Sequence, residues 1–279
     1  MRPWVLIPVF NAPAALQRCL EALDETLSPG ERVLLCDDAS TDAAVAPLIE
    51  RWQAGTALEV HVERSRQNRG FVGNVNAAMA RLGGEDAILL NTDTVPAPGW
   101  FEAMVRCAEV DPRIATATPW SNNAEICSFP QLCIAAPIPG QRALKAIGRA
   151  AAQMVDVQPP ELPTGVGFAM FVRGSAWTTL GGFDEATFGR GYGEENDFCR
   201  RAAGHGWRNV LCPTAYVAHE GHASFAGTGH SPGGENLRRL TARYPDYNER
   251  VATFICEDPL RPLRDRLAEL LERESGIPS

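Results

Sequence analysis

The fold is decided by the stretch Arg32-Val33-Leu34-Leu35-Cys36-Asp37-Asp38, a short apolar run that ends in two carboxylates. An amphipathic stretch follows it at residues 44–52. A short apolar run followed by a helical pattern is typical of one strand-helix unit of an α/β sheet. The stretch therefore predicts a buried strand whose carboxyl end carries acidic side chains.

The same strand-then-helix order recurs on both sides of this stretch. Strand-like runs lie at residues 4–9, 58–62 and 87–90, and amphipathic stretches follow them at 14–23, 72–82 and 100–108. Four such units predict a mostly parallel sheet with helices on both faces. Ligands of such sheets bind at the carboxyl ends of the strands, so the residues after each run are the candidates for function.

The remaining chain carries weaker patterns. Residues 120–165 are rich in Asn, Pro and Gly around a helical pattern at 142–154, and we expect a loop-rich connector there. Further expected elements are a strand at 166–172, a short helix at 175–180, a helix at 195–203 and a helical tail at 236–273. The chain has no internal repeat or break in composition, so a single domain over 1–279 is predicted.

Composition excludes several classes of protein. The 279 residues carry a formal charge of −8, which argues against a nucleic-acid-binding surface but allows a small phosphorylated ligand held through a cation. The eight cysteines are dispersed, and we expect reduced, buried thiols. No apolar run is long enough to span a bilayer, and Met1 leads directly into a strand-like run. We therefore expect a cytoplasmic protein without a signal peptide.

Polar residues follow three of the predicted strands. Asn11 follows the first strand, Asp37 and Asp38 end the second, and Asn91-Thr92-Asp93 follows the fourth. Asn and Asp also favour turns and helix caps, and residues 40–42 are interpreted as caps. Three such ends at one sheet edge nevertheless favour a ligand site, where Asp93 could hold Mg²⁺ or Mn²⁺ against a diphosphate.

Two further segments carry candidate chemistry. A glycine-rich loop, 189–193, delivers Glu194 and Glu195 to a predicted helix start, where the helix dipole favours an ionised carboxylate that can act as a general base. Acidic residues also simply stabilise helix starts, and the spacing alone leaves both interpretations open. His219 ends a β-prone run and could complete a metal site with Asp93, although a single histidine is more often structural. His222 and His230 are assigned no role.

Taken together, these segments resemble the ordered motifs of family 2 glycosyltransferases over residues 4–225. The similarity is strongest to the rhamnosyltransferase-like branch, whose metal motif is commonly Asn-Pro-Asp; Thr92 stands in place of that proline. The matching segments are Val5–Asn11, Cys36–Asp42, Asn68–Phe71 with Asn74 and Asn76, Leu90–Asp93, Thr164–Gly167, Gly181–Glu185, Glu194–Asp197 and His219.

The resemblance implies a GT-A fold, with a Rossmann-like, mostly parallel central sheet flanked by helices and with C-terminal helices. About 1–119 would bind the nucleotide sugar, about 120–235 would form the acceptor and catalytic half, and about 236–279 would be a helical tail. The donor-binding residues would be Pro8, Asn11, Asp37, Asp38, Asn68, Arg69, Asn91, Thr92 and Asp93.

The resemblance also implies chemical roles. Asp93 and His219 would bind the divalent cation, Mn²⁺ or Mg²⁺, that neutralises the departing nucleoside diphosphate. Glu195 would be the catalytic base, and Glu194 and Asp197 would complete the catalytic motif. Glu195 takes the position of an Asp in the family's Glu-Asp pair, so its carboxylate is one methylene further from the backbone.

These expectations describe an inverting glycosyltransferase that transfers a sugar from a UDP- or dTDP-sugar to a hydroxyl of a glycan or lipid-linked acceptor, in surface polysaccharide biosynthesis. The alternative is a catalytically inactive protein that binds a sugar nucleotide or acts as a scaffold, and retention of Asp93, Glu195 and His219 argues against it. A nucleotidyltransferase would want a Gly-rich loop with Arg and Lys where the chain has Asn11-Ala12-Pro13.

The acceptor side is the least determined by the sequence. Residues 120–165 and 221–235 are loops beside the predicted site and are candidate acceptor walls. In the tail, arginines alternate with leucines, which leaves open a peripheral contact with the inner face of a membrane, with salt-bridged packing favoured. These residues are Leu260, Arg261, Leu263, Arg264, Arg266 and Leu267. The sequence indicates no oligomeric state.

Overall fold

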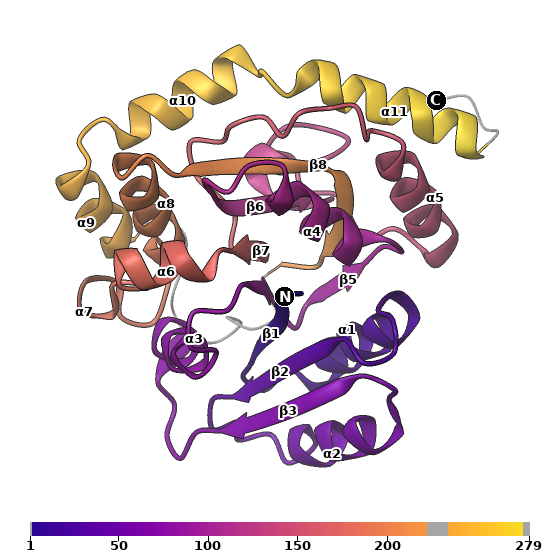
Figure 1. The fold of residues 1–279 in the computed structure, drawn as a ribbon, viewed down its shortest axis with the longest axis vertical. Helices are drawn as coiled ribbons and strands as arrows, with labels where there is room; N and C mark the ends of the chain where they lie inside the picture. The colour runs from indigo at the N-terminus through magenta and orange to yellow at the C-terminus, as the bar shows by residue number, and fades with distance from the viewer. Residues whose placement is uncertain (1, 222–233, 276–279) are drawn as a thin grey trace.

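A computed structural model describes residues 2–221 and 234–275, and the described residues form one eight-stranded sheet covered by helices (Figure 1). Its first half consists of the predicted strand-helix units. The parallel strands are β1 (Trp4–Val9), β2 (Arg32–Asp37), β3 (Glu59–Arg64) and β4 (Ala87–Leu90), and the helices are α1 (Pro13–Thr26), α2 (Val45–Gly55), α3 (Gly70–Arg81) and α4 (Trp100–Glu109). The periodicity of the sequence therefore predicted this half correctly.

The second half of the sheet is mixed. The strand order is β3-β2-β1-β4-β7-β6-β8-β5, with β5 at Thr94–Pro96, β6 at Ile114–Trp120, β7 at Ala169–Val172 and β8 at Arg208–His219. The β6–β8 pair is parallel, whereas the β4–β7, β6–β7 and β5–β8 pairs are antiparallel. The mostly parallel sheet that we expected is therefore parallel only in its first half and around β6. The sequence did not predict β5, β6 or the first part of β8.

The second half of the described chain adds four helices and a short turn before the tail. They are α5 (Gln141–Ala152), α6 (Gly174–Leu180), α7 (Glu185–Phe188) and α8 (Glu194–Gly204), with a 3-10 turn η1 at Glu125–Cys127. The predicted tail is divided into α9 (Glu235–Arg243), α10 (Tyr247–Glu257) and α11 (Arg261–Ser275), and α10 and α11 run across the top of the molecule in Figure 1. The β4–β7 pairing joins the two halves, and the proposed divisions near 119 and 235 stay predictions.

The tail packs onto the protein through buried leucines and ion pairs. Leu260 and Leu267 are fully buried, and the buried Arg264 pairs with Asp258 at 3.0 Å and donates to the Ser128 carbonyl. Arg266 pairs with Asp156. These contacts match the salt-bridged packing that the sequence favoured for this segment.

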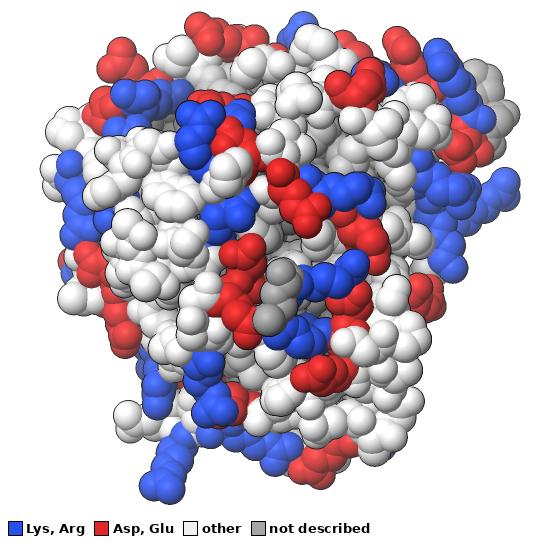
Figure 2. Space-filling view, viewed as in Figure 1, with Lys and Arg blue, Asp and Glu red and all other residues white. Residues whose placement is uncertain are grey.

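Two surface properties bear on the expectations. None of the helices in the described ranges is long and apolar enough to cross a membrane. Basic and acidic side chains are interspersed over the face shown in Figure 2.

All eight cysteines are free thiols, and six of them are buried, as the composition predicted.

Candidate active site

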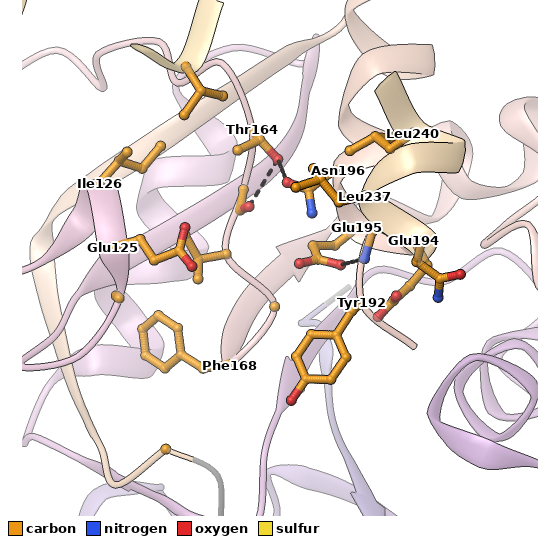
Figure 3. A pocket seen from close by; sticks show the side chains of 18 of the residues that line it. Glu125, Ile126, Thr164, Phe168, Tyr192, Glu194, Glu195, Asn196, Leu237 and Leu240 are labelled. Atoms are coloured by element: carbon orange, nitrogen blue, oxygen red, sulfur yellow. Dashed lines mark hydrogen bonds between the residues drawn. The ribbon is translucent and has the colours of Figure 1, made fainter. Parts of the chain in front are cut away.

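The pair Glu194-Glu195 begins helix α8, as the sequence predicted. The preceding loop needs a left-handed backbone, with φ of 69° at Tyr192 and 107° at Gly193. This conformation lets the Gly193 N–H donate to Glu195 Oε2 at 3.3 Å, which fixes the side chain at the helix start. Figure 3 shows the Glu195 carboxylate reaching into the pocket beside Tyr192. Glu194 is buried, with 4 % of its surface exposed, and Glu195 is half-buried.

The two carboxyls share one protonation equilibrium. Burial, and secondly the negative charge of Glu195, raises the pKa of Glu194 well above its ordinary value. Burial also raises the pKa of Glu195, but the N–H groups at the helix start oppose this shift. Because two adjacent carboxylates cannot both ionise easily, we expect Glu194 to hold the proton and Glu195 to be the ionised member.

Asp197 is engaged in ion pairs. It is fully buried, and its oxygens accept from Arg201 at 2.7 Å, from Arg243 at 2.7 Å and from the Tyr244 hydroxyl at 2.9 Å. It does not line the pocket formed by the described residues around Glu195. Removal of either arginine would leave a buried charge undercompensated. These contacts fasten α8 to α9, and the catalytic role expected of Asp197 from the motif stays a prediction.

Asp93 and His219 lie side by side because β5 and β8 pair in register, with Thr94 opposite His219. Their Oδ1 and Nε2 atoms are 3.5 Å apart, and Asp93 is 4 % exposed. The imidazole is oriented by a 2.8 Å contact between Nδ1 and the Asn123 carbonyl and by stacking on Phe168. Burial alone would lower the pKa of His219, but the adjacent Asp93 carboxylate raises it above the ordinary value.

This pair fits two ligands of one divalent cation. Two ligand atoms about 2.1 Å from a cation and at right angles to each other lie about 3.0 Å apart, close to the observed 3.5 Å. Among the described residues, no group of three or more His, Cys, Asp or Glu could hold a metal ion. Such a site would therefore take its other ligands from water and from substrate phosphates, as Mg²⁺ sites usually do.

The predicted donor-binding residues that follow β1 and β2 accept hydrogen bonds from backbone N–H groups at the same edge of the sheet. The Asn11 side-chain oxygen accepts from the N–H groups of Thr41 and Asp42, at 2.8 and 3.0 Å. Asp38 is buried and accepts from the N–H groups of Arg69 and Gly70, both at 2.8 Å, at the start of α3. These contacts shape the edge on which a nucleoside would lie.

The other predicted donor-binding residues occupy the same edge or its neighbour. Asp37 accepts from the Ser40 N–H, and Asn68 donates to the Asp38 carbonyl. Pro8 lies in β1 opposite Cys36. Asn91 lies at the end of β4 and lines the pocket, and Thr92 is buried beside it.

A pocket of about 640 Å³ joins the metal pair to the carboxylate pair. Of the predicted site residues, it is lined by Asn91, Asp93, Glu194, Glu195 and His219. Its volume is in the range of small-molecule sites. None of Pro8, Asn11, Asp37, Asp38, Asn68 and Arg69 lines this described pocket.

The sequence did not point to several pocket residues. Glu125 faces Glu195 from the opposite wall in Figure 3, where η1 holds it at a φ of 46°. Tyr247 and Ile255 come from α10, far along the chain. A left-handed conformation at a glutamate has no sequence signature, and the nearby signals were the candidate acceptor wall at 120–165, which contains Glu125, and the Thr164–Gly167 motif of the resemblance. Most of the second candidate acceptor wall, 221–235, lies outside the described residues, as do His222 and His230.

Comparison with known proteins agrees with this geometry. Residues 4–132 match the family described as "Glycosyl transferase family 2". The chain is 27% identical over 264 residues to an N-acetylglucosaminyl-diphospho-decaprenol L-rhamnosyltransferase of Mycobacterium tuberculosis, covering 86% of this chain and 80% of that protein.

Two solved structures share the fold. The mannosyltransferase PcManGT from Pyrobaculum calidifontis, in complex with GDP-Man and Mn²⁺, superposes with a TM-score of 0.57 at 14% identity, covering 100% of this chain and 76% of that one. TarS of S. aureus, in complex with UDP-GlcNAc, gives a TM-score of 0.58 at 16% identity, covering 99% and 73%. The chain is therefore similar to the family 2 glycosyltransferases, and it has the GT-A fold.

Proposed function

We propose that the protein is an inverting, metal-dependent glycosyltransferase that transfers a sugar from a UDP- or dTDP-sugar to a hydroxyl of a glycan or lipid-linked acceptor. The observation that carries the proposal is the single pocket lined both by the Asp93–His219 pair and by Glu195. One end of this pocket suits a leaving diphosphate and the other suits a base.

Glu195 is the proposed base. It projects from the first turn of α8 into the pocket, and the Gly193 N–H stabilises its ionised form. The raised pKa of its neighbour Glu194 favours the protonated form of that side chain, which is a poor nucleophile. With Glu195 as the base, direct attack by the acceptor hydroxyl accounts for the chemistry and inverts the anomeric carbon.

Asp93 and His219 are the proposed protein ligands of Mn²⁺ or Mg²⁺. When bound, the cation neutralises charge on the departing nucleoside diphosphate. Two protein ligands of mixed oxygen and nitrogen type fit Mn²⁺. The Mn²⁺ in the PcManGT complex supports the same assignment.

The donor edge is proposed to bind the nucleoside through Pro8, Asn11, Asp37, Asp38, Asn68 and Arg69, with Asn91 and Thr92 next to the sugar. The GT-A relatives in complex with GDP-Man and UDP-GlcNAc support a nucleoside-diphosphate sugar as donor. The proposal includes a role in surface polysaccharide biosynthesis, at the cytoplasmic face of a membrane, and similarity to a protein named as a rhamnosyltransferase supports sugar transfer as the activity.

A thermal-shift screen tests this function first. UDP-, dTDP- and GDP-sugars are each added with Mn²⁺ and then with a chelator, because a selective ligand raises the unfolding midpoint by mass action. We expect a shift with a UDP- or dTDP-sugar that is lost on chelation. A shift with GDP-sugars alone would contradict the donor class, and a shift that survives chelation would contradict the metal. Donor binding without turnover against any acceptor panel would favour the inactive sugar-nucleotide-binding alternative.

A further inference from the structure

Helix α10 turns its apolar side toward the pocket. Tyr247, Val251 and Ile255 are spaced at i, i+4 and i+8 and therefore share one side of the helix, and all three line the pocket with Ala252. A surface helix usually buries its apolar stripe in the core. In α10, only Tyr247 is buried, whereas Ile255 is 37% exposed. We call Val251, Ala252 and Ile255 the α10 face.

The α10 face is held rigidly over the catalytic helix. The Tyr247 hydroxyl donates to the Asn196 side chain, which also accepts from Thr164 at 2.9 Å. Arg200 of α8 pairs with Asp246, just before α10, at 2.9 Å. The position of the α10 face relative to Glu195 is therefore fixed by contacts on the described chain.

The part of the pocket between this face and Glu195 carries two carboxylates, those of Glu125 and Glu195. Its described lining includes no Lys or Arg. Glu125 and Glu195 extend toward each other from opposite walls in Figure 3, and the charge of Glu125 contributes to the raised pKa of Glu195. A phosphate placed between these carboxylates would be repelled, and the described lining offers it no Lys or Arg.

We propose that the α10 face binds an apolar group attached to the accepting sugar through an uncharged linkage, so that the acceptor is an alkyl or aryl glycoside and not a sugar diphosphate lipid. The proposal rests on the glycosyltransferase function and specifies its acceptor. The accepting sugar lies between Glu125 and Glu195, with its hydroxyl at the base, and its apolar aglycone covers the α10 face. Burial of apolar surface supplies affinity that the acidic walls alone do not give.

Calorimetric titration of the full chain without donor tests this directly. The probes are octyl β-glucoside below its micelle concentration, p-nitrophenyl β-glucoside, glucose and glucose 1-phosphate, repeated with the N-acetylglucosamine series. We expect at least one of the apolar glycosides to bind about tenfold or more tightly than its free sugar, and the 1-phosphate to bind more weakly than the free sugar. Whichever of the octyl and nitrophenyl glycosides binds more tightly shows whether the apolar group is an alkyl or an aryl group.

Ile255→Asp is the decisive variant, because this exposed side chain can be changed without opening the core. It should weaken binding of the apolar glycoside about fivefold or more and leave the free sugar unaffected. Val110→Asp is the matched control, since Val110 is also exposed, at 49%, and lies outside the pocket. If Ile255→Asp lowers the unfolding midpoint, the same titration is repeated with Ile255→Ser. Glu125→Gln should reduce the difference in affinity between the free sugar and its 1-phosphate.

Three results would overturn the proposal: equal affinity for apolar glycosides and free sugars, including binding of none of them; tighter binding of the 1-phosphate; or equal losses in Ile255→Asp and Val110→Asp. Because these titrations need neither donor nor turnover, their failure leaves the donor screen unaffected. Conversely, a failed donor screen would contradict the proposed function even if the glycosides bind.

Discussion

The proposed donor edge, formed by Asn11, Asp37 and Asp38, differs from the proposed catalytic edge, formed by Asp93, Glu194, Glu195 and His219, although acidic residues dominate both. At the donor edge, Asn11 and Asp38 accept backbone N–H groups and hold loops and a helix start in place. At the catalytic edge, carboxyls line a pocket and burial raises the pKa of Glu194 and Glu195. The same residue types stabilise the fold at one edge and are held ready for chemistry at the other.

The largest expected effect is at the catalytic edge. Glu195→Gln should lower turnover by about 10²- to 10⁴-fold, because an amide cannot take the proton of the acceptor hydroxyl. Donor affinity by titration should change little. Glu185→Gln, the same substitution at the start of the neighbouring helix α7, is the control and should keep its turnover. Near-normal turnover in Glu195→Gln would remove Glu195 as the base.

Asp93→Ala should weaken Mn²⁺-dependent donor binding by at least about tenfold, since even changes around a metal's ligands typically cost about 10- to 100-fold in affinity. Binding titrations with and without chelator measure this effect. Asp37→Ala, at the donor edge, should retain its sensitivity to chelator. If both variants lost that sensitivity, the two edges would not be separable by metal dependence.

The pH dependence of activity should follow the ionisation of the proposed base, Glu195. Glu195 must be ionised to accept a proton, and burial raises its pKa above the ordinary 4.5. Activity measured as kcat/KM should therefore fall as pH falls through a value above 4.5, by about tenfold per pH unit below that point. An acid limb at or below 4.5 would show that Glu195 is not desolvated in the free enzyme.

Asp38→Asn should lower the free energy of unfolding by about 1–3 kcal/mol, because one of the two N–H groups at the start of α3 loses its acceptor. Urea unfolding measures the change. Asp37→Asn is the matched control: its Oδ1 accepts a single N–H, which an asparagine oxygen can still accept. Unchanged stability of Asp38→Asn with lost donor affinity would make Asp38 a ligand and not a cap.

The smallest effect is expected for Glu194→Gln, which should stabilise the protein where Asp38→Asn destabilises it. The pKa of Glu194 is raised in the folded protein, so its contribution to stability is complete below the ordinary pKa of the unfolded chain and is lost as pH rises through the folded value. Glu194→Gln stays neutral and should therefore raise the unfolding midpoint at neutral pH, by about 2–4 °C per kcal/mol gained. The gain should vanish in acid. A lower midpoint at neutral pH would contradict a protonated Glu194.

The sequence predicted the first half of the fold because each strand there is a short apolar run between turn residues. β6 and the first part of β8 were missed for a physical reason. β6 alternates Thr and Ala and contains Pro119, and Pro213 interrupts the apolar residues of β8. Both are nevertheless almost completely buried. Contacts with neighbouring strands and helices, and not local propensity, stabilise these strands.

The sequence by itself determined the four strand-helix units, the order of the family motifs and the identity of the acidic residues near the site. Tertiary structure alone decided which carboxylate is paired and which is available. Glu195 and Asp197 are two positions apart on α8, so their side chains point about 200° apart around the helix. One therefore faces the pocket, while the other meets Arg243, which lies in α9 and reaches Asp197 only because the tail folds back over the catalytic helix.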